Sequence, residues 1–436
     1  METLDYIGRA SRAGRHRHAR YSVGVSPAPD PAAAPEPPRF RASRGFVVLL
    51  AALGSIGPFA IDTYLPSLPA IGRDLAASPV QVQQTLSAYL FAFAMAILWH
   101  GSVSDALGRR RVLLFSYAVF AGASVGAALA GSIEALWFWR AVQGLVGGAG
   151  LAISRAVIRD LAHGADAHRL MAQSTMVFAL APAIAPMIGG LLQDWLGWRA
   201  VFWFLVLMAS ALWLAVLLLL PETLPPGRRQ SLRPASLARG YVSVFRQAQF
   251  WRLSLAMGTS FQGFFLYVMA APAFLITLLG LAPTQFYWLF LPFTIGTMGG
   301  ALLASRLADR FAPDVSIRLG QVLMAGAVAA NLLVSWLLPG ALPWAALPLC
   351  VYTFGLAIAT PPLQVMLSDL SPERRGMVSS CHGFVQSLAN SLAAALLVPL
   401  LWGSLISLAL GSAALMGVGA VLLVAQRRFR PQPAGR

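Results

Sequence analysis

Two ionisable side chains stand inside long apolar stretches of this chain, where charged groups are rare. Asp62 lies toward the end of the apolar run 45–67, and Arg140 lies well inside the run 134–157. A charge at the centre of a bilayer costs about 2.5–3.5 kcal/mol on insertion scales, so these residues are predicted to be functional. A carboxyl group at such a position can bind and release a proton. Gln143 lies three residues after Arg140 on the same helix face and can share its hydrogen-bonding partners.

Both charged residues also have a structural interpretation. Asp62, shortly before Pro66, would be a helix cap at the membrane surface. Arg140 would belong to a buried ion pair, with Glu134 as the acid on its own segment, and such pairs add little stability. The cost of placing a charge in hydrocarbon favours the functional interpretation of both residues.

A short polar segment, residues 101–111, separates the apolar runs 79–100 and 112–130. A loop this short makes two helices antiparallel neighbours, and its two glycines permit a tight turn. Its acid and three arginines cannot lie in hydrocarbon, so they mark one face of the membrane. A weaker copy returns at residues 305–312, which predicts that the chain consists of two related halves.

Proline and glycine are concentrated in the apolar segment 169–191. Pro182 and Pro186 remove backbone hydrogen bonds and are predicted to kink this helix. Gly189 and Gly190 lack side chains, so another helix can approach closely. The pattern predicts a tight helix interface, with ordinary small-residue packing as the alternative.

Most of the chain is predicted to be embedded in a membrane. Of its 436 residues, 58% are hydrophobic and 11% are charged, whereas a soluble protein carries about 25% charged residues. We predict an all-α integral membrane fold of twelve spanning helices in two six-helix halves, each helix near the ~20 residues that cross a bilayer. The predicted spans are 45–67, 79–100, 112–130, 134–157, 169–191, 199–220, 250–276, 284–304, 316–338, 342–367, 377–398 and 403–425.

The arginines determine the predicted orientation. The net charge is +16, and an excess of basic residues marks cytoplasmic loops, so both termini are predicted to be cytoplasmic. Because the arginines gather on one side of the membrane, no nucleic-acid partner is predicted. The predicted parts are a disordered basic cytoplasmic tail (1–44), an N-terminal half (45–222), a cytoplasmic linker loop (223–249), a C-terminal half (250–426) and a cytoplasmic tail (427–436).

Several kinds of chemistry are not expected. The chain has no lysine, so it has no phosphate-binding loop of the G-x-x-x-x-G-K-[ST] type, and ATP-driven transport by this chain alone is excluded. Cys350 and Cys381 lack metal-site spacing and the histidines do not cluster, so no metal or cofactor is predicted. Without a catalytic cluster, an enzyme is not expected either.

Four motifs in order make the chain similar to the major facilitator superfamily over about residues 45–426. Within that superfamily it resembles the drug:proton antiporters of the bicyclomycin/chloramphenicol-resistance (Bcr/CflA) type. The polar loop matches at Gly101, Asp105, Gly108, Arg109 and Arg110, with Ala106 where an arginine is usual. The other motifs are Asp62-Thr-Tyr-Leu-Pro66-Ser-Leu-Pro69, Arg140-Ala-Val-Gln143-Gly144, and Ala181 to Gly190, in which Ala185 stands where glycine is common.

The resemblance implies three sets of functional residues. Asp62, Arg140 and Gln143 would couple protons to substrate. Asp105 would engage the N-terminus of the helix that begins near Gly376 and Met377, and would thereby close the cytoplasmic side. The whole gating set is Gly101, Asp105, Gly108, Arg109, Arg110 and Arg159. The antiporter set, which would prevent leak while the halves rock, is Pro182, Pro186, Gly189 and Gly190.

A drug pocket needs broad apolar walls and a few polar groups. Nine aromatic and polar residues are predicted to line it: Tyr64, Tyr89, Phe93, Phe178, Phe261, Gln262, Tyr267, Gln386 and Asn390. The predicted function is proton-coupled efflux of small, largely apolar drugs or xenobiotics across the bacterial inner membrane by alternating access. The partners would be these compounds, protons and membrane lipids, with the protein a monomer. A specific metabolite exporter or symporter of the same fold is the alternative, followed by a non-transporting membrane protein.

Overall fold

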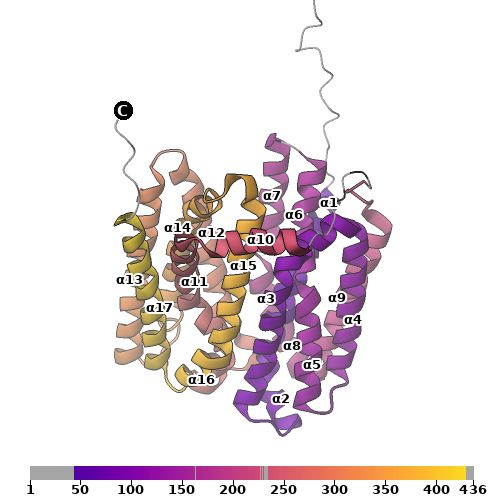
Figure 1. Cartoon of the computed structure of the whole chain (residues 1–436). Helices are drawn as coiled ribbons and strands as arrows, with labels where there is room; N and C mark the ends of the chain where they lie inside the picture. Colours follow the sequence, from indigo (N-terminus) through magenta and orange to yellow (C-terminus); the bar gives the residue numbers. More distant parts are fainter. Residues whose placement is uncertain (1–43, 163, 226, 228, 230–233, 429–436) are drawn as a thin grey trace, which may run out of the picture. The chain divides into compact units, whose positions relative to one another are not determined.

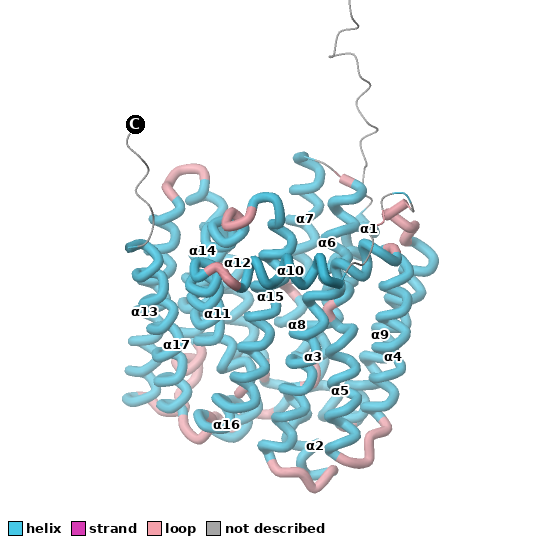
Figure 2. The backbone as a smooth tube through the Cα atoms, viewed as in Figure 1, coloured by secondary structure: helices cyan, strands magenta, loops and turns pink. Residues whose placement is uncertain are grey.

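The computed structural model describes residues 44–162, 164–225, 227, 229 and 234–428, and this part of the chain is helical without strands (Figure 2). It contains 11 helices that are long and apolar enough to cross a membrane, or up to 12 when one bent pair counts as a single span. The predicted all-α membrane fold is confirmed. The two predicted tails lie almost entirely outside the described residues.

The N-terminal half contains six spans, several of them broken. Its helices are α1 (Arg44–Asp62), η2 (Leu65–Ser67), α2 (Leu68–Asp74), α3 (Pro79–Leu107), α4 (Arg109–Ala128), α5 (Ile133–Gly147), α6 (Ala149–Leu161), α7 (Gly164–Phe178), α8 (Ala181–Leu196) and α9 (Trp198–Leu219). The first span runs from α1 into α2, the fourth from α5 into α6, and the fifth from α7 into α8.

The C-terminal half follows a helix in the linker. The predicted linker loop contains α10 (Pro234–Phe245), and the half itself is α11 (Ala248–Met269), η4 (Pro272–Leu278), η5 (Pro283–Gln285), α12 (Tyr287–Ala308), α13 (Pro313–Leu337), α14 (Leu347–Ser368), η6 (Pro372–Arg374), α15 (Arg375–Leu392), η7 (Ala393–Leu397), α16 (Val398–Leu401) and α17 (Leu405–Arg428). Its first span is the bent pair, in which α11 and η4 meet at 44°.

The polar turn of the first half is shorter than predicted. Ser78 and Gln81 form a reciprocal capping box that begins α3, which then continues through Gly101 to Leu107. Gly108 alone makes the turn, with a φ of 102° that side chains rarely tolerate. The prediction that both glycines form the turn is therefore wrong for Gly101, which lies inside the helix.

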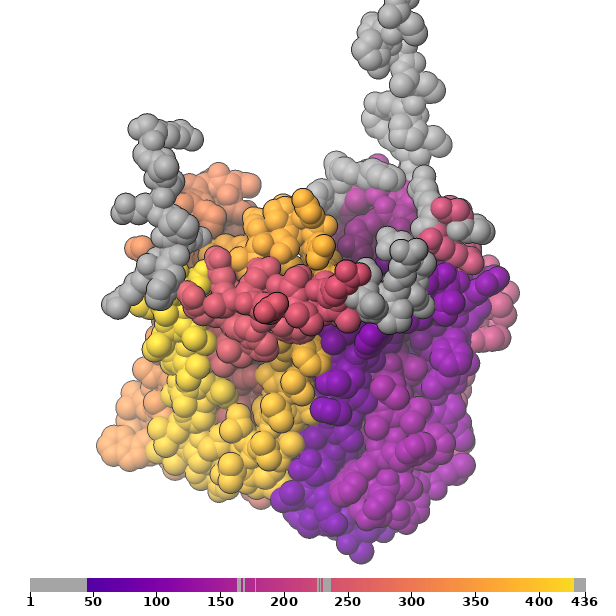
Figure 3. All heavy atoms as spheres, viewed as in Figure 1, coloured from indigo at the N-terminus to yellow at the C-terminus, as the bar shows by residue number. Residues whose placement is uncertain are grey.

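The two halves lie side by side, with α10 across their seam at one end (Figures 1 and 3). Tyr241 of α10 donates a hydrogen bond to the Leu98 carbonyl of α3, at 2.6 Å. On the other side, Gly240 of α10 lies against Met377 of α15. We call this the linker end of the helix bundle, and the end with α2 and α16 the far end.

Candidate functional site

The Arg140 guanidinium lies in a fully buried aromatic sandwich. Arg140 belongs to α5 and has no exposed surface. Its Cζ atom is 4.5 Å from the ring centroids of both Tyr64 and Tyr89, so two aromatic faces attract the cation. Nη1 donates hydrogen bonds to the Ala60 carbonyl at 3.0 Å and to Gln143 Oε1 at 2.8 Å. Neutral oxygens and aromatic rings therefore hold this charge.

Further hydrogen bonds fix the residues that surround Arg140. Gln143 Nε2 donates to Ser124 Oγ of α4 at 2.7 Å, which orients the amide oxygen toward the guanidinium. The Tyr64 hydroxyl hydrogen-bonds to Thr85 Oγ1 of α3 at 2.7 Å. The site is therefore built from four of the six spans of this half.

The guanidinium is nevertheless incompletely satisfied. Its Nε and Nη2 atoms are buried and have no hydrogen-bond partner, and none of the ion pairs in the described part of the chain involves Arg140. Glu134, the acid on the same segment, is exposed and is not its partner. The Arg140 cation is thus buried without an anion, which is a costly arrangement.

Asp62 ends α1, beside the Arg140 site. The residue is only 6% exposed, and the Ala60 carbonyl two positions earlier accepts a hydrogen bond from Arg140. A carboxylate at a helix C-terminus opposes the helix dipole and does not stabilise the helix by that interaction. The chain breaks its helix here before η2 begins at Leu65. The structure thus brings Asp62, Arg140 and Gln143 to one region of the N-terminal half.

Arg109 organises the linker end of the same half. Its guanidinium forms ion pairs with Asp105 at 2.5 Å and with Asp160 of α6 at 3.2 Å, and it donates to Ser104 Oγ at 2.6 Å. Its backbone N–H donates to Glu222 Oε1 at 2.9 Å, beyond the end of α9. One side chain thereby joins the ends of α3, α4 and α6.

The predicted latch between the halves is not formed in this structure. Asp105 pairs with Arg109 of its own half, where Arg159 and the N-terminus of α15 were the expected partners. Met377, near that N-terminus, instead packs against Gly240 of α10. Sequence reasoning missed Asp160, one residue past the predicted Arg159. It also missed Glu222, although this acid stands directly after the last apolar run.

The predicted cavity residues separate into distinct groups. Tyr64 and Tyr89 form the Arg140 sandwich, and Phe93 stacks near Tyr89 with ring centroids 6.2 Å apart. Phe178 lies beside Gly54 of α1, and Phe261 packs on Phe265 at 5.0 Å. Tyr267 is buried in the second half and accepts a hydrogen bond from Asn331 Nδ2 at 2.6 Å. These residues thus contact different neighbours, in both halves of the molecule.

Three of the predicted residues form an amide cluster in the second half. Gln262 Nε2 of α11 donates to Asn390 Oδ1 of α15 at 2.6 Å. Gln386 Nε2 donates to the same oxygen at 3.1 Å. The cluster carries no formal charge, in contrast with the Arg140 site.

The glycines of α8 make contacts of two kinds. A Cβ at Gly189 would collide with the Thr63 backbone within the N-terminal half, and one at Gly190 would collide with the Pro283 backbone of the other half. Pro182 begins α8 and Pro186 lies inside it. The predicted tight interface is therefore present, and Gly190 belongs to the contact between the halves.

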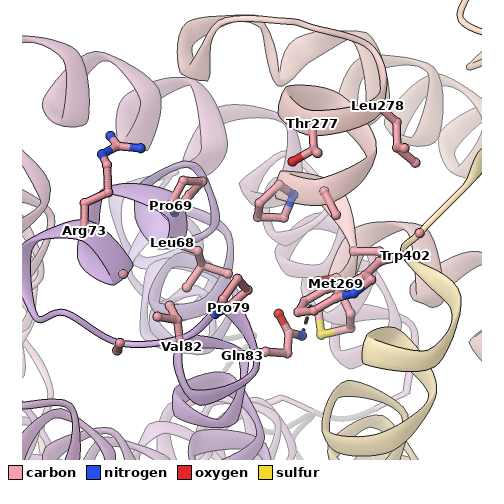
Figure 4. A pocket seen from close by; sticks show the side chains of 16 residues that line it. Leu68, Pro69, Arg73, Pro79, Val82, Gln83, Met269, Thr277, Leu278 and Trp402 are labelled. Carbon is pink, nitrogen blue, oxygen red and sulfur yellow. Dashed lines mark hydrogen bonds between the residues drawn. The ribbon is translucent and has the colours of Figure 1, made fainter.

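Hydrogen bonds between α3 and the C-terminal half also join the two halves. Ser391 Oγ donates to the Ser87 carbonyl at 3.0 Å, and Gln84 Nε2 donates to the Ala395 carbonyl at 3.2 Å. A cavity of about 600 Å³ lies among the far-end residues, between α2 and α3 on one side and α11, η4 and the segment after α16 on the other (Figure 4). Gln83 reaches across it to the Met269 carbonyl at 3.4 Å. The cavity therefore has walls from both halves.

Comparisons with known proteins agree with this architecture. A sequence model of the Major Facilitator Superfamily matches residues 48–394. The chain is 30% identical over 315 residues to the chloramphenicol resistance protein of Pseudomonas aeruginosa, covering 72% of this chain and 74% of the relative. It is also 30% identical over 274 residues to a bicyclomycin resistance protein homolog of Haemophilus influenzae, covering 63% and 69%. A solved D-xylose-proton symporter shares the fold, with a TM-score of 0.71 and 18% identity over 90% of this chain and 100% of that one.

The resemblance to the bicyclomycin and chloramphenicol resistance type is confirmed by these relatives. In the described part of the chain, no three His, Cys, Asp or Glu residues are grouped so that they could hold a metal ion. The spans, the two halves and the matched family lead to one conclusion. The chain belongs to the major facilitator superfamily and is a multi-pass membrane transporter, not an enzyme.

Proposed function

We propose that this protein is a proton-coupled exporter of small, largely apolar drugs across the bacterial inner membrane. The observation that carries the proposal is the fully buried Arg140 guanidinium, whose Nε and Nη2 atoms have no partner. Asp62 ends the helix whose Ala60 carbonyl accepts from Arg140, and it belongs to none of the ion pairs among the described residues. The names of two relatives, which refer to chloramphenicol and bicyclomycin resistance, support drugs as the substrate class.

In the proposed mechanism, Asp62 carries the proton. A protonated carboxyl group is neutral and leaves Arg140 to the tyrosine rings and neutral oxygens that hold it here. When Asp62 loses its proton, its negative charge attracts the unpaired N–H groups of Arg140. Because Asp62 is at the break between α1 and η2, a change in this attraction acts at the joint of the first span.

The proton gradient supplies the free energy, and no cofactor takes part. Proton entry releases about 1.4 kcal/mol per pH unit and about 2.3 kcal/mol per charge for each 100 mV. The two halves rock around the bound drug, so that the far-end contacts open when those at the linker end close. In the proposed orientation, which follows the positive-inside rule, the linker end faces the cytoplasm and the far end faces outward.

Two measurements test the proposed function. Expression in a host that lacks its own pumps should raise resistance to chloramphenicol or to other small apolar drugs in a panel. In inside-out membrane vesicles with an acidic lumen, the same drugs should accumulate, and a protonophore should abolish the accumulation. Accumulation that survives the protonophore would remove proton coupling. A panel without any change in resistance would remove drug export.

A further inference from the structure

Helices α11 and α15 are joined by a ladder of polar pairs. Ser254 Oγ and His382 Nδ1 are 2.8 Å apart, and Gln262 Nε2 and Asn390 Oδ1 are 2.6 Å apart. Both pairs have a sequence separation of 128. Both helices begin at the linker end, so they run in parallel. Because the offset is constant, the polar pairs follow one another from the linker end toward the centre of the half.

The central position of the ladder lacks a side chain on one helix. Gly258 of α11 lies opposite Gln386 of α15, and a Cβ built on Gly258 would meet only Gln386 Oε1, at 3.7 Å. That distance is an ordinary van der Waals contact. A methyl group at position 258 would therefore fit beside the amide cluster, and the close packing of the helices does not require a glycine there.

One atom of the ladder has an unused hydrogen-bonding capacity. Gln262 is only 2% exposed, and its Oε1 atom is buried without a donor. The Nε2 groups of Gln262 and Gln386 both donate to Asn390 Oδ1, so neither of these two hydrogen bonds involves Gln262 Oε1. A buried acceptor left without a partner costs about 1–3 kcal/mol, and a structure that only joined two helices would gain nothing from it.

We infer that the ladder is the substrate-reading surface of the C-terminal half. It accepts a hydrogen bond from an uncharged N–H or O–H group of the substrate at Gln262 Oε1, and that group enters beside Gly258. This inference rests on the proposed export function and adds the substrate class to it. The preferred substrates are neutral, largely apolar molecules that carry at least one hydrogen-bond donor.

The test compares pairs of compounds that differ by one methyl group. The probes are chloramphenicol and its mono-O-methyl ethers, together with other drugs from the resistance panel and their O- or N-methylated derivatives. For each pair, kcat/KM of energised uptake is measured in inside-out vesicles with the unchanged chain. We expect the compound with the free donor to be favoured by about tenfold, the value of one good hydrogen bond.

Three variants separate substrate reading from a structural role. Gln262→Leu should bring the ratio near one, because the compound with the free donor loses more uptake than its methylated partner. Gly258→Ala removes no hydrogen bond and adds a methyl group at an ordinary contact distance, so it should fold normally. It should nevertheless lower the ratio, because it fills the space beside the cluster. Asn331→Leu is the matched control: it removes a buried amide hydrogen bond, to Tyr267, away from the ladder, and should keep the ratio.

The outcomes distinguish this inference from the export function. If the unchanged chain transports the probes without preferring the free donor, the inference is wrong and the export function stands. A ratio that Gln262→Leu and Gly258→Ala both leave unchanged would also overturn it, as would a parallel loss of both compounds. If the Gln262→Leu protein does not accumulate in the membrane, the Gly258→Ala variant alone tests the inference. If no probe is transported, the export function itself has failed.

Discussion

The two halves share a fold but hold different chemistry at their centres. The N-terminal half buries a cation between two aromatic rings, with a carboxyl group nearby. In the other half, the Gln262, Gln386 and Asn390 cluster is neutral. The two halves therefore differ in charge at these sites, although both are built from six spans. In the proposed function, the charged site couples the proton and the neutral cluster recognises the substrate.

The largest expected effect comes from removing the carboxylate. Asp62→Asn keeps the size of the side chain but cannot release a proton, so energised drug uptake in vesicles should fall to background. Downhill movement of the drug, measured without a pH gradient, should persist because the C-terminal half is unchanged. Full gradient-driven uptake by this variant would end the assignment of Asp62.

Replacing Arg140 by a neutral residue removes the buried charge from the site in the N-terminal half. That site then resembles the neutral amide cluster of the C-terminal half. Arg140→Gln removes the charge between Tyr64 and Tyr89, and energised uptake should fall by at least tenfold. Arg140→Lys keeps the charge but loses the planar geometry that stacks on two rings, so partial activity is expected. If Arg140→Gln and Gln262→Leu gave the same phenotype, the division of labour between the halves would be wrong.

Substitutions at two adjacent glycines of α8 should have different effects on folding and on transport. Gly189→Ala would press on the Thr63 backbone within one half, so unfolding should become easier by about 1–3 kcal/mol. Gly190→Ala would press on the Pro283 backbone of the other half. It should therefore disturb transport more than the unfolding of either half. Thermal unfolding and vesicle uptake of both variants check this pair, and the opposite pattern would contradict it.

Arg109 and Arg110 are neighbours at the linker end, and their removal should lower the stability of the protein by different amounts. Arg109→Ala leaves Asp105 and Asp160 without their shared cation, and a loss of about 1–3 kcal/mol in stability is expected. Arg110 is half-buried and donates one hydrogen bond to the Leu217 carbonyl, so Arg110→Ala should cost about 1 kcal/mol. Chemical unfolding of the purified variants measures both values, and equal losses would argue against Arg109 as the organising residue.

The smallest expected effect concerns the linker helix. Burial raises the pKa of Tyr241, opposed by its hydrogen bond with Ser102, so the hydroxyl stays protonated and continues to donate to the Leu98 carbonyl. Tyr241→Phe removes this donor and should cost about 1 kcal/mol. A melting temperature unchanged by the substitution would show that α10 is not held to α3 by this bond.

The spans were predictable because long apolar runs have few alternatives to crossing a membrane. The breaks at Asp62 and between Gly147 and Ala149 were not, since helix interruptions inside spans depend on tertiary packing. The helix α10 was missed because the linker is polar and its helix is docked by Tyr241 and Met377, which lie far apart in the sequence.

The candidate site was predictable in its charged members and less so in their partners. Asp62 and Arg140 stand out by their cost in an apolar run, and Gln143 by its helical spacing. The tyrosine sandwich could not be derived, because Tyr64 and Tyr89 were expected as cavity walls and only the fold places them over Arg140. Asp105 was predicted to act as a latch between the halves. Arg109, four residues later, instead provides a cation for it within its own half.

Proton release on drug binding shows whether Asp62 carries the coupled proton. Purified protein in weakly buffered detergent solution is mixed with an exported drug, and the pH is followed with an indicator dye. We expect the unchanged chain to release protons when the drug binds and Asp62→Asn to bind the drug without releasing them. Equal proton release by both proteins would contradict this assignment, because the proton would then come from another group.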